Sequence, residues 1–204
     1  MARKPGPRAN HLRMRIAQEA ARVIREQGVK DYFIAKKKAA SRLGVFDRNA
    51  LPSNAEIAEA VGEQQRLFEG DQHVESLTGL RRAARESMRL LHSFEPRLVG
   101  PVLEGTATAH SEVSLHLFAE TPEAVALALM GQGIPYDSAQ RRVKMRDGRY
   151  VYMPVFRFTG GDVDVDATVF PPLGLREPPA SPVDGRPMRR ARLAEVEALL
   201  EEAI

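Results

Sequence analysis

The sequence predicts an α+β protein, in which an N-terminal helical region precedes a small mixed β-sheet and a C-terminal helix closes the chain. Two observations carry this prediction. Up to residue 93, hydrophobic residues recur at the three- and four-residue spacing of amphipathic helices. Beyond it, short segments alternate between hydrophobic and polar residues as strands do, with one helical segment among them and another at the end.

Composition excludes several classes of protein. The chain has 204 residues, of which 43% are hydrophobic and 28% charged, and it contains no Cys and no Trp. This length suffices to bury a core, and no apolar run approaches the roughly 18 residues of a membrane span. Without Cys there are no disulfides, thiolate zinc sites or Cys nucleophiles. The basic N-terminus lacks the apolar stretch of a secretory signal, so we expect a cytoplasmic protein without membrane contact.

We expect four parts along the chain: a flexible basic arm over 1–10, a basic helical region over 11–73, the α/β core over 74–175, and a Pro-rich crossover with the C-terminal helix over 176–204. Positive charge is concentrated at the front. Residues 1–50 hold 13 Lys and Arg against 4 Asp and Glu, and the remainder holds 17 against 23. Such a distribution indicates either a polyanionic partner or docking of one part of the protein on another.

Helices are predicted over 11–27 and 31–43 by their periodic hydrophobic residues. Ser53 and Glu56 form a capping box that opens a third helix, and a fourth is expected over 74–93.

The run Lys36, Lys37 and Lys38 is the densest positive charge in the chain. These lysines are candidates for non-specific binding of nucleic-acid phosphates, which needs charge rather than base readout. The alternative is a helical extension that docks within the protein.

The second half is expected to form the sheet. A helix should begin at Thr121, with Pro122 in its first turn, and Gly160-Gly161 should join two strands in a hairpin. A C-terminal helix is expected from about residue 193. The predicted strands are 97–104, 112–118, 141–146, 150–158 and 163–170.

The stretch from Gly100 to Leu115 resembles the core motif of the nucleotidyltransferase superfamily, the DNA polymerase β-like fold. In that motif a Gly-Ser pair ends one strand, a Gly-Thr-Ala turn often follows, and Ser-Asp-h-Asp-h (h, hydrophobic) opens the next strand. Gly100 takes the place of the family glycine, Gly105-Thr106-Ala107 that of the turn, and Ser111 that of the serine before the carboxylate strand. The resemblance covers roughly residues 75–175.

The resemblance implies a metal site. Glu112 and Ser114 fall where the family has its two metal-binding aspartates, and Asp166 matches a third carboxylate on a later strand. Residues two apart on a strand share a face, so Asp164 can assist Asp166. By this likeness Glu112, Asp164 and Asp166 are the catalytic candidates, with Glu112 and Asp166 as Mg²⁺ ligands. In the family, two Mg²⁺ ions bridge the nucleotide phosphates and activate a hydroxyl. The nucleotide-binding candidates are Gly100, Gly105, Thr106, Ser111, Ser114, Arg189 and Arg190.

Three positions depart from the family pattern. Pro101 replaces the serine that follows the first glycine, Glu112 lengthens the first carboxylate arm, and the neutral Ser114 replaces the second aspartate. Some of the remaining candidates also have ordinary structural interpretations. His116 is either a ligand or base, or a hydrogen-bonded cleft histidine. Alternating acids up to Asp166 are also typical of a solvated edge strand.

The leading interpretation is therefore a nucleotidyltransferase-like protein with a degenerate site that binds a nucleotide or nucleic acid. If it is active, it transfers a nucleoside monophosphate from a nucleoside triphosphate to a hydroxyl with Mg²⁺. The alternative is a non-catalytic nucleic-acid-binding or regulatory protein that uses its basic N-terminal helices. A scaffold that only dimerises is a third interpretation. The sequence leaves open the base, the acceptor and the oligomeric state.

Overall fold

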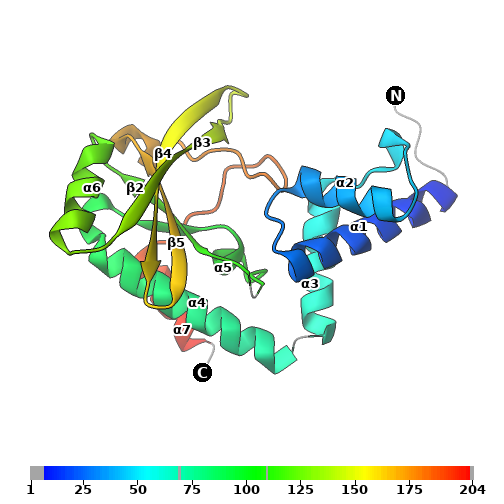
Figure 1. Cartoon of the computed structure of the whole chain (residues 1–204), viewed down its shortest axis with the longest axis horizontal. Coiled ribbons are helices and arrows are strands. Elements are labelled where there is room, and N and C mark those ends of the chain that lie inside the picture. Colours follow the sequence, from blue (N-terminus) through cyan, green and yellow to red (C-terminus); the bar gives the residue numbers. More distant parts are fainter. Residues whose placement is uncertain (1–6, 69, 109, 203–204) are drawn as a thin grey trace. The chain divides into compact units, whose positions relative to one another are not determined.

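A computed structural model describes residues 7–68, 70–108 and 110–202 (Figure 1). The chain divides into two compact units. The first comprises the chain up to His73 together with the short segments Thr108–His110 and Pro182–Asp184, and the second comprises the rest. Each unit has a hydrophobic core of its own.

The first unit is helical. Its elements are α1 (Pro7–Gln27), α2 (Tyr32–Arg42), the 3₁₀ turn η1 (Arg48–Ala50) and α3 (Asn54–Phe68). The periodicity therefore placed these helices correctly. α1 already begins at Pro7, within the stretch expected to be a flexible arm, while residues 1–6 lie outside the described residues.

Local hydrogen bonds fix where the helices of the first unit begin. The carboxylate of Asp31 caps α2 by accepting bonds from the backbone N–H groups of Phe33 (2.7 Å) and Ile34 (3.1 Å). Ser53 and Glu56 make the predicted capping box: Ser53 N–H donates to the Glu56 carboxylate at 2.6 Å, and Glu56 N–H donates to Ser53 Oγ at 3.2 Å. The core joins large aliphatic residues to many alanines, which allow helices to approach closely.

The second unit contains, within the described residues, a five-stranded sheet in the order β1-β2-β5-β4-β3. β2 and β5 are parallel, and every other neighbouring pair is antiparallel. A mixed sheet with helices is the α+β class that the sequence predicts. The strands are β1 (Arg97–Val99), β2 (Val113–Phe118), β3 (Tyr136–Lys144), β4 (Tyr150–Gly160) and β5 (Val163–Phe170).

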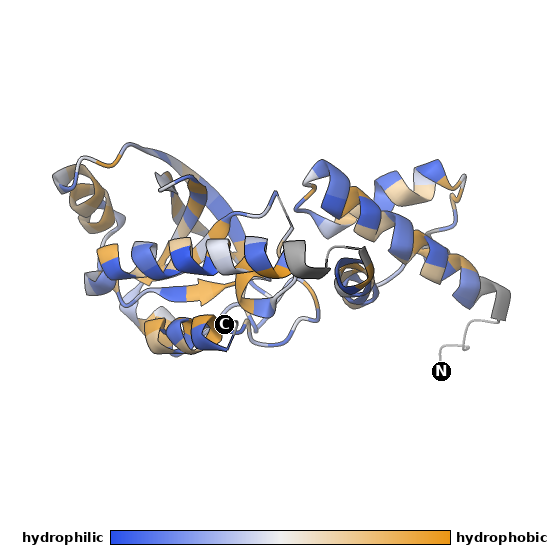
Figure 2. Ribbon diagram, turned by 90° about the horizontal axis from the view of Figure 1, so that it is seen from below, coloured by the Kyte–Doolittle hydropathy of each residue, from blue (hydrophilic) through white to orange (hydrophobic). Residues whose placement is uncertain are grey.

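Hydrophobic residues on one face of this sheet pack with helices to form the core. Leu115 of β2 and Ala167 of β5, which are partners in the register, join Met88 of α4, Leu129 of α6 and Val196 of α7 in one buried cluster. Figure 2 shows hydrophobic and hydrophilic residues alternating along α4, as expected of a helix with one buried side. The remaining elements are α4 (Gly70–Leu90), η2 (His92–Phe94), α5 (Pro101–Glu104), α6 (Pro122–Gly131), η3 (Pro172–Leu175) and α7 (Leu193–Glu201).

Two predictions about the strands are wrong. The segment 97–104 is a strand only as far as Val99, because Gly100 turns the chain and Pro101 starts α5. β5 lies at the centre of the sheet, between β2 and β4, so its aspartates do not protect an exposed edge.

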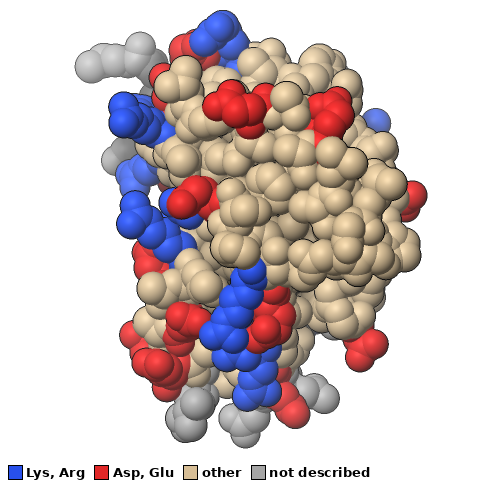
Figure 3. Space-filling model, turned by 90° about the vertical axis from the view of Figure 1, so that its left-hand side faces the viewer, with Lys and Arg blue, Asp and Glu red and all other residues tan. Residues whose placement is uncertain are grey.

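No helix in the described part of the chain is long and apolar enough to cross a membrane. Some hydrophobic surface is nevertheless exposed on α6, where Leu127 and Met130 face solvent. Figure 3 looks from the side on which α6 lies and shows a broad area with few charged side chains.

Candidate functional site

The motif residues meet on the face of the sheet opposite to the core, which we call the polar face. The register of the parallel pair sets Ser114 beside Asp166 and His116 beside Thr168. β4 adds Arg157, whose register partner on β5 is also Asp166. Strand alternation therefore aligns Ser114, Asp166 and Arg157 in one row across the sheet.

Asp166 is the centre of this face. In the described part of the chain it is the only buried acidic residue, with 1% of its surface exposed. Arg141 of β3 binds it through two bonds: Nη1 donates to Oδ1 at 2.8 Å and Nη2 to Oδ2 at 2.8 Å. Arg157 Nε adds a third bond to Oδ2 at 3.3 Å. Parallel bonds from a guanidinium to a carboxylate are a strong and directional contact.

This arrangement does not fit a magnesium ion at Asp166. Mg²⁺ needs carboxylate oxygens as ligands, and Arg141 engages both oxygens of Asp166. The neighbouring Ser114 contributes no charge. Among the residues described, no group of three or more His, Asp or Glu side chains is placed to hold a metal. Glu112 lies just before β2, two residues ahead of Ser114, and Asp164 is exposed on β5.

The glycine turn of the motif is present. Gly100 caps α5 with φ 70° and ψ −155°, a conformation that side chains other than hydrogen rarely allow. A Cβ at Gly100 would stand 4.0 Å from Oγ of Ser114, so the turn passes beside the row of Ser114, Asp166 and Arg157. Gly105 ends α5 with φ 78°, and Thr106 N–H donates to the carbonyl oxygen of Pro101 at 2.9 Å. Ser111 lies in the loop that leads to β2.

His116 is a buried, hydrogen-bonded histidine. Its Nδ1 accepts a bond from Nε of Arg190 at 3.0 Å, and its ring lies 4.6 Å from that of Phe170. Burial, followed by the charges of Arg190 and Arg141, holds the pKa of His116 well below its usual range. The imidazole is therefore neutral, with Nδ1 as the acceptor. The cleft-histidine interpretation is the one that this geometry supports.

Arg190 carries a charge that lacks an acidic partner within the described residues. It donates to His116 and to the carbonyl oxygen of Gly174 (2.6 Å), and it stacks over Phe118 and Phe170 at 5.0 and 5.1 Å. Its Nη2 is buried without a hydrogen-bond partner in the described structure. Burial, with a smaller effect of Arg97, lowers the pKa of Arg190 to about 10, so it stays charged at neutral pH.

The structure brings together four of the sequence candidates. Gly100, Ser114, Asp166 and Arg190 meet on or beside the polar face. Arg189 is exposed. Its charge acts on Arg81 of α4, whose pKa is lowered by burial first and by Arg189 second.

Sequence reasoning missed Arg141 and Arg157. Both lie on strands whose alternation was readable, so each could be assigned to one face of its own strand. Their meeting with Asp166 depends on the register of β3, β4 and β5, and that register brings together residues 25 positions apart. Without the register, nothing in the spacing selects them from the other arginines.

The three consecutive lysines of α2 do not form one patch. Successive helical residues point about 100° apart, so a run of three spreads around the helix. Lys36 Nζ donates to the carbonyl oxygen of Pro52 at 2.8 Å, and burial lowers its pKa. Lys37 and Lys38 instead line a shallow groove with Arg42, and Lys38 also donates to Gln27 Oε1 at 3.2 Å. The remaining lining residues of this groove are Gln27, Phe33, Ile34 and Ser41.

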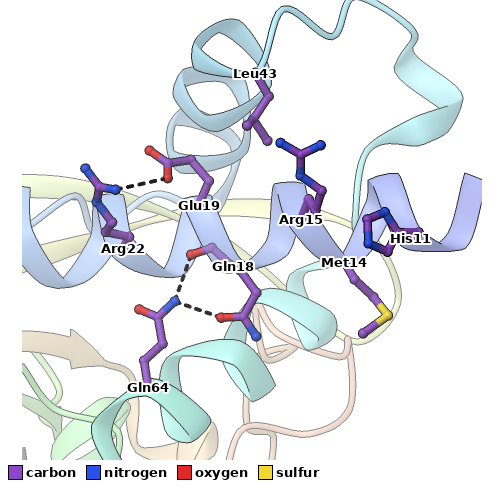
Figure 4. A pocket seen from close by; sticks show the side chains of 8 residues that line it. All are labelled: His11, Met14, Arg15, Gln18, Glu19, Arg22, Leu43 and Gln64. Carbon is purple, nitrogen blue, oxygen red and sulfur yellow. Dashed lines mark hydrogen bonds and ion pairs between the residues drawn. The ribbon is translucent and has the colours of Figure 1, made fainter. Parts of the chain in front are cut away.

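A second hollow of the first unit lies along α1 and is shown in Figure 4. One of its two arginines is paired, because Glu19 contacts Arg22 at 3.7 Å; Glu19 also pairs with Arg42 of the other groove at 2.8 Å. Gln64 donates to the carbonyl oxygen and to the side-chain oxygen of Gln18, at 2.9 and 2.8 Å. This hollow is therefore a mixed polar surface whose main contacts already hold α1 and α3 together.

Comparison with known proteins gives matches among solved structures alone. No family model matches the sequence, and no curated protein matches it. A Cid1 poly(U) polymerase mutant bound to MgATP matches with 18% identity and a TM-score of 0.36, covering 57% of this chain and 38% of that one. A cytoplasmic RNA terminal U-transferase matches with 18% identity and a TM-score of 0.31, covering 55% and 34%. The GLD-2/RNP-8 complex matches with 12% identity and a TM-score of 0.32, covering 58% and 48%.

The matches span about a third to a half of the length of those chains.

Proposed function

We propose that this chain is a nucleotidyltransferase-like protein with a degenerate site, whose polar face binds nucleotide phosphates through arginines without a metal ion. The observation that carries the proposal is the two-bond contact between Arg141 and Asp166 at 2.8 Å. In a magnesium site the carboxylate holds a cation that in turn holds phosphate oxygens. Here a guanidinium occupies the place of that cation.

The charges of the polar face support phosphate binding. Asp166 makes its two-bond contact with only one of the two arginines that bind it, and Asp137, the β3 register partner of Arg157, forms no ion pair with Arg157 in the described part of the chain. The side chain of Arg157 is 55% exposed and makes a single 3.3 Å bond to Asp166, so most of its N–H donors face solvent. Arg190 adds a third positive charge, held over the rings of Phe118 and Phe170. A guanidinium can bind two phosphate oxygens at once through two parallel N–H bonds. Because Arg157 is the exposed arginine of this face, we expect it to contact a ligand first.

The alternative to metal-free binding is Mg²⁺-dependent transfer of a nucleoside monophosphate, which would make the protein an enzyme. It would require Arg141 to release Asp166, so that Glu112 and Asp166 could hold Mg²⁺ with Asp164 assisting. The turn that contains Gly100, Gly105 and Thr106 would then lie against the terminal phosphates, with Ser111 and Ser114 nearby and Arg189 as a further cation. A matched poly(U) polymerase is bound to MgATP, which makes nucleoside triphosphates the first ligands to try.

Isothermal titration with ATP and UTP, in Mg²⁺ and in EDTA, tests the proposal. We expect binding in EDTA that Arg157→Ala weakens about tenfold, since one charge-assisted contact is worth roughly 1.5–3 kcal/mol. Arg82→Ala, which removes an exposed arginine of α4, serves as the matched control and should bind as the wild type does. Absence of binding in both buffers would overturn the proposal. Binding in Mg²⁺ alone would favour the transferase, and an acceptor assay would follow.

A second candidate is nucleic-acid binding by the helical unit, favoured by the groove that Lys37, Lys38 and Arg42 line. A gel shift with duplex DNA tests it. Lys37→Gln together with Lys38→Gln should abolish a salt-sensitive shift, because it removes two phosphate contacts. Lys36→Gln is the matched control, since Lys36 bonds to Pro52 instead of facing the groove. No shift, or a shift that persists in high salt, would count against this candidate.

A further inference from the structure

The β3–β4 hairpin carries an exposed aromatic and basic surface that the polar face does not use. The register pairs Arg142 with Tyr152 and Lys144 with Tyr150, so these four side chains share one side of the hairpin. Tyr150 is 54% exposed and Tyr152 67% exposed. Gln140, also exposed, lies on the same side. We call this set, Gln140, Arg142, Lys144, Tyr150 and Tyr152, the tyrosine face.

The tyrosine face is not an extension of the hydrophobic core. Further along the same side of the hairpin, Tyr136 and Phe156 meet edge to face, with ring centroids 5.3 Å apart, and pack against the core. On this side of β3, Tyr136 is half-buried and the side chains from Ser138 onward are exposed. A position beyond the core needs no aromatic ring for stability, and adjacent exposed rings are typical of a binding surface.

The charge of the tyrosine face is positive. Arg142 lies over the ring of Tyr150 at 4.4 Å, a cation–π contact that holds both side chains in place. In the described part of the chain neither Arg142 nor Lys144 forms an ion pair. The nearest acid along the hairpin, Asp147 in its turn, is already paired with Arg149. An uncompensated pair of cations beside two rings selects an anionic partner that also has flat faces.

The edge of β3 is closed to an added strand at this end. Ala180 N–H donates to the carbonyl oxygen of Lys144 at 2.9 Å, so the Pro-rich segment occupies a backbone acceptor of β3. A protein strand therefore cannot extend the sheet there by backbone pairing. Recognition has to use the side chains of the tyrosine face.

We propose that the tyrosine face binds single-stranded nucleic acid. Bases stack on Tyr152 and on the face of Tyr150 opposite Arg142. The two tyrosines, two residues apart on one strand, are separated by about 7 Å, and Arg142 and Lys144 contact the adjoining phosphates. Stacking on aromatic residues with a basic track beside them binds single strands with little sequence preference. In a duplex the bases stack on one another, so their faces cannot stack on the two tyrosine rings.

This site is separate from the polar face, because alternation places Arg142 and Arg141 on opposite sides of β3. The proposal therefore stands or fails independently of nucleotide binding at Asp166.

Anisotropy of a fluorescein-labelled twelve-nucleotide oligo(U), with oligo(dT) and a duplex of equal length as comparisons, tests the proposal on the full chain. Tyr150→Ala together with Tyr152→Ala should weaken binding of the single strands at least about tenfold, because each stacked base contributes strongly. Tyr152→Phe keeps the ring and should bind within about twofold of wild type. Met130→Ala, which removes an exposed apolar side chain of α6, is the matched control and should change nothing.

A second readout is intrinsic to the chain. It contains four Tyr and no Trp, so its emission comes from tyrosine, and oligo(U) that stacks on two of the four should quench it. Binding that persists in the double Tyr variant, or that is lost only when Lys37 and Lys38 are neutralised, would overturn the proposal. Equal affinity for the duplex, or no binding of any oligonucleotide, would overturn it too. Loss of nucleotide binding in Arg157→Ala with unchanged oligo(U) affinity would show that the polar face and the tyrosine face bind their ligands independently.

Discussion

Asp166 decides the chemistry of the polar face at the scale of single residues. Its carboxylate lies in the central strand of the sheet, where an unpaired charge would be strongly disfavoured. Arg141 supplies the partner and engages both oxygens. The resemblance predicted an acidic residue at this position, but a metal was the expected partner. In the structure the contact is made by a guanidinium, from a strand residue that the motif does not include.

Removing Arg141 should therefore destabilise the protein. Arg141→Met keeps the hydrophobic stem but leaves Asp166 buried with only the Arg157 bond, and we expect a loss of about 1–3 kcal/mol in the free energy of unfolding. Urea denaturation followed by circular dichroism measures it. Adding Asp166→Asn to Arg141→Met should restore part of the loss, because the buried charge is gone. A loss no larger than that of Arg82→Met would contradict the importance of the pair.

His116 predicts a dependence of stability on pH. Its pKa is lowered in the folded chain by burial, by Arg190 and by Arg141. Below the ordinary value of 6.5 the unfolded chain takes up a proton that the folded chain does not, so the free energy of unfolding falls as the pH falls. The fall is at most about 1.4 kcal/mol per pH unit.

Denaturation curves between pH 7.5 and about 5 should show this slope in the wild type. His116→Asn, which keeps an acceptor for Arg190, should flatten it. His92→Asn, at an exposed histidine of the same unit, is the matched control and should leave the slope as it is. An unchanged slope in His116→Asn would contradict a buried neutral imidazole.

At the scale of elements, sequence and structure agree where order is local. Helical periodicity, the Ser53–Glu56 capping box and the Gly160-Gly161 hairpin were readable because each depends on residues a few positions apart. The short β1 was not, because strand propensity continued through a segment where Gly100 and Pro101 start a helix. The central place of β5 was not readable either, since strand order depends on pairing across long stretches of chain.

The backbone of Gly100 gives a test of that turn. With φ 70° and ψ −155° the position favours glycine, so Gly100→Ala should cost about 1–3 kcal/mol in the free energy of unfolding. Gly79→Ala is an opposite control: Gly79 lies inside α4 with open space around it, and alanine there should stabilise by about 0.5–1 kcal/mol. Thermal unfolding of both variants compares them. Equal and small effects would contradict the strained turn.

At the scale of the whole molecule, the concentration of positive charge in the first fifty residues was readable from composition alone. The helical unit uses part of that charge internally, as Lys36 and Arg42 show by their bonds to Pro52 and Glu19. The second unit has the candidate site, and its character depends on three strands meeting in one register. Residue type and order therefore singled out Asp166 as a candidate, while its partner required the assembled sheet.

The replacement of a metal by Arg141 is the central claim, and Mn²⁺ titration followed by NMR tests it most directly. Mn²⁺ takes the same oxygen ligands as Mg²⁺ and broadens the signals of nearby amides. The account predicts that the amide signals of Ser114 and Asp166 keep their widths while Mn²⁺ is added to the wild-type chain. Selective broadening of these two signals at low Mn²⁺ concentration would contradict it, because the polar face would then hold a metal despite Arg141.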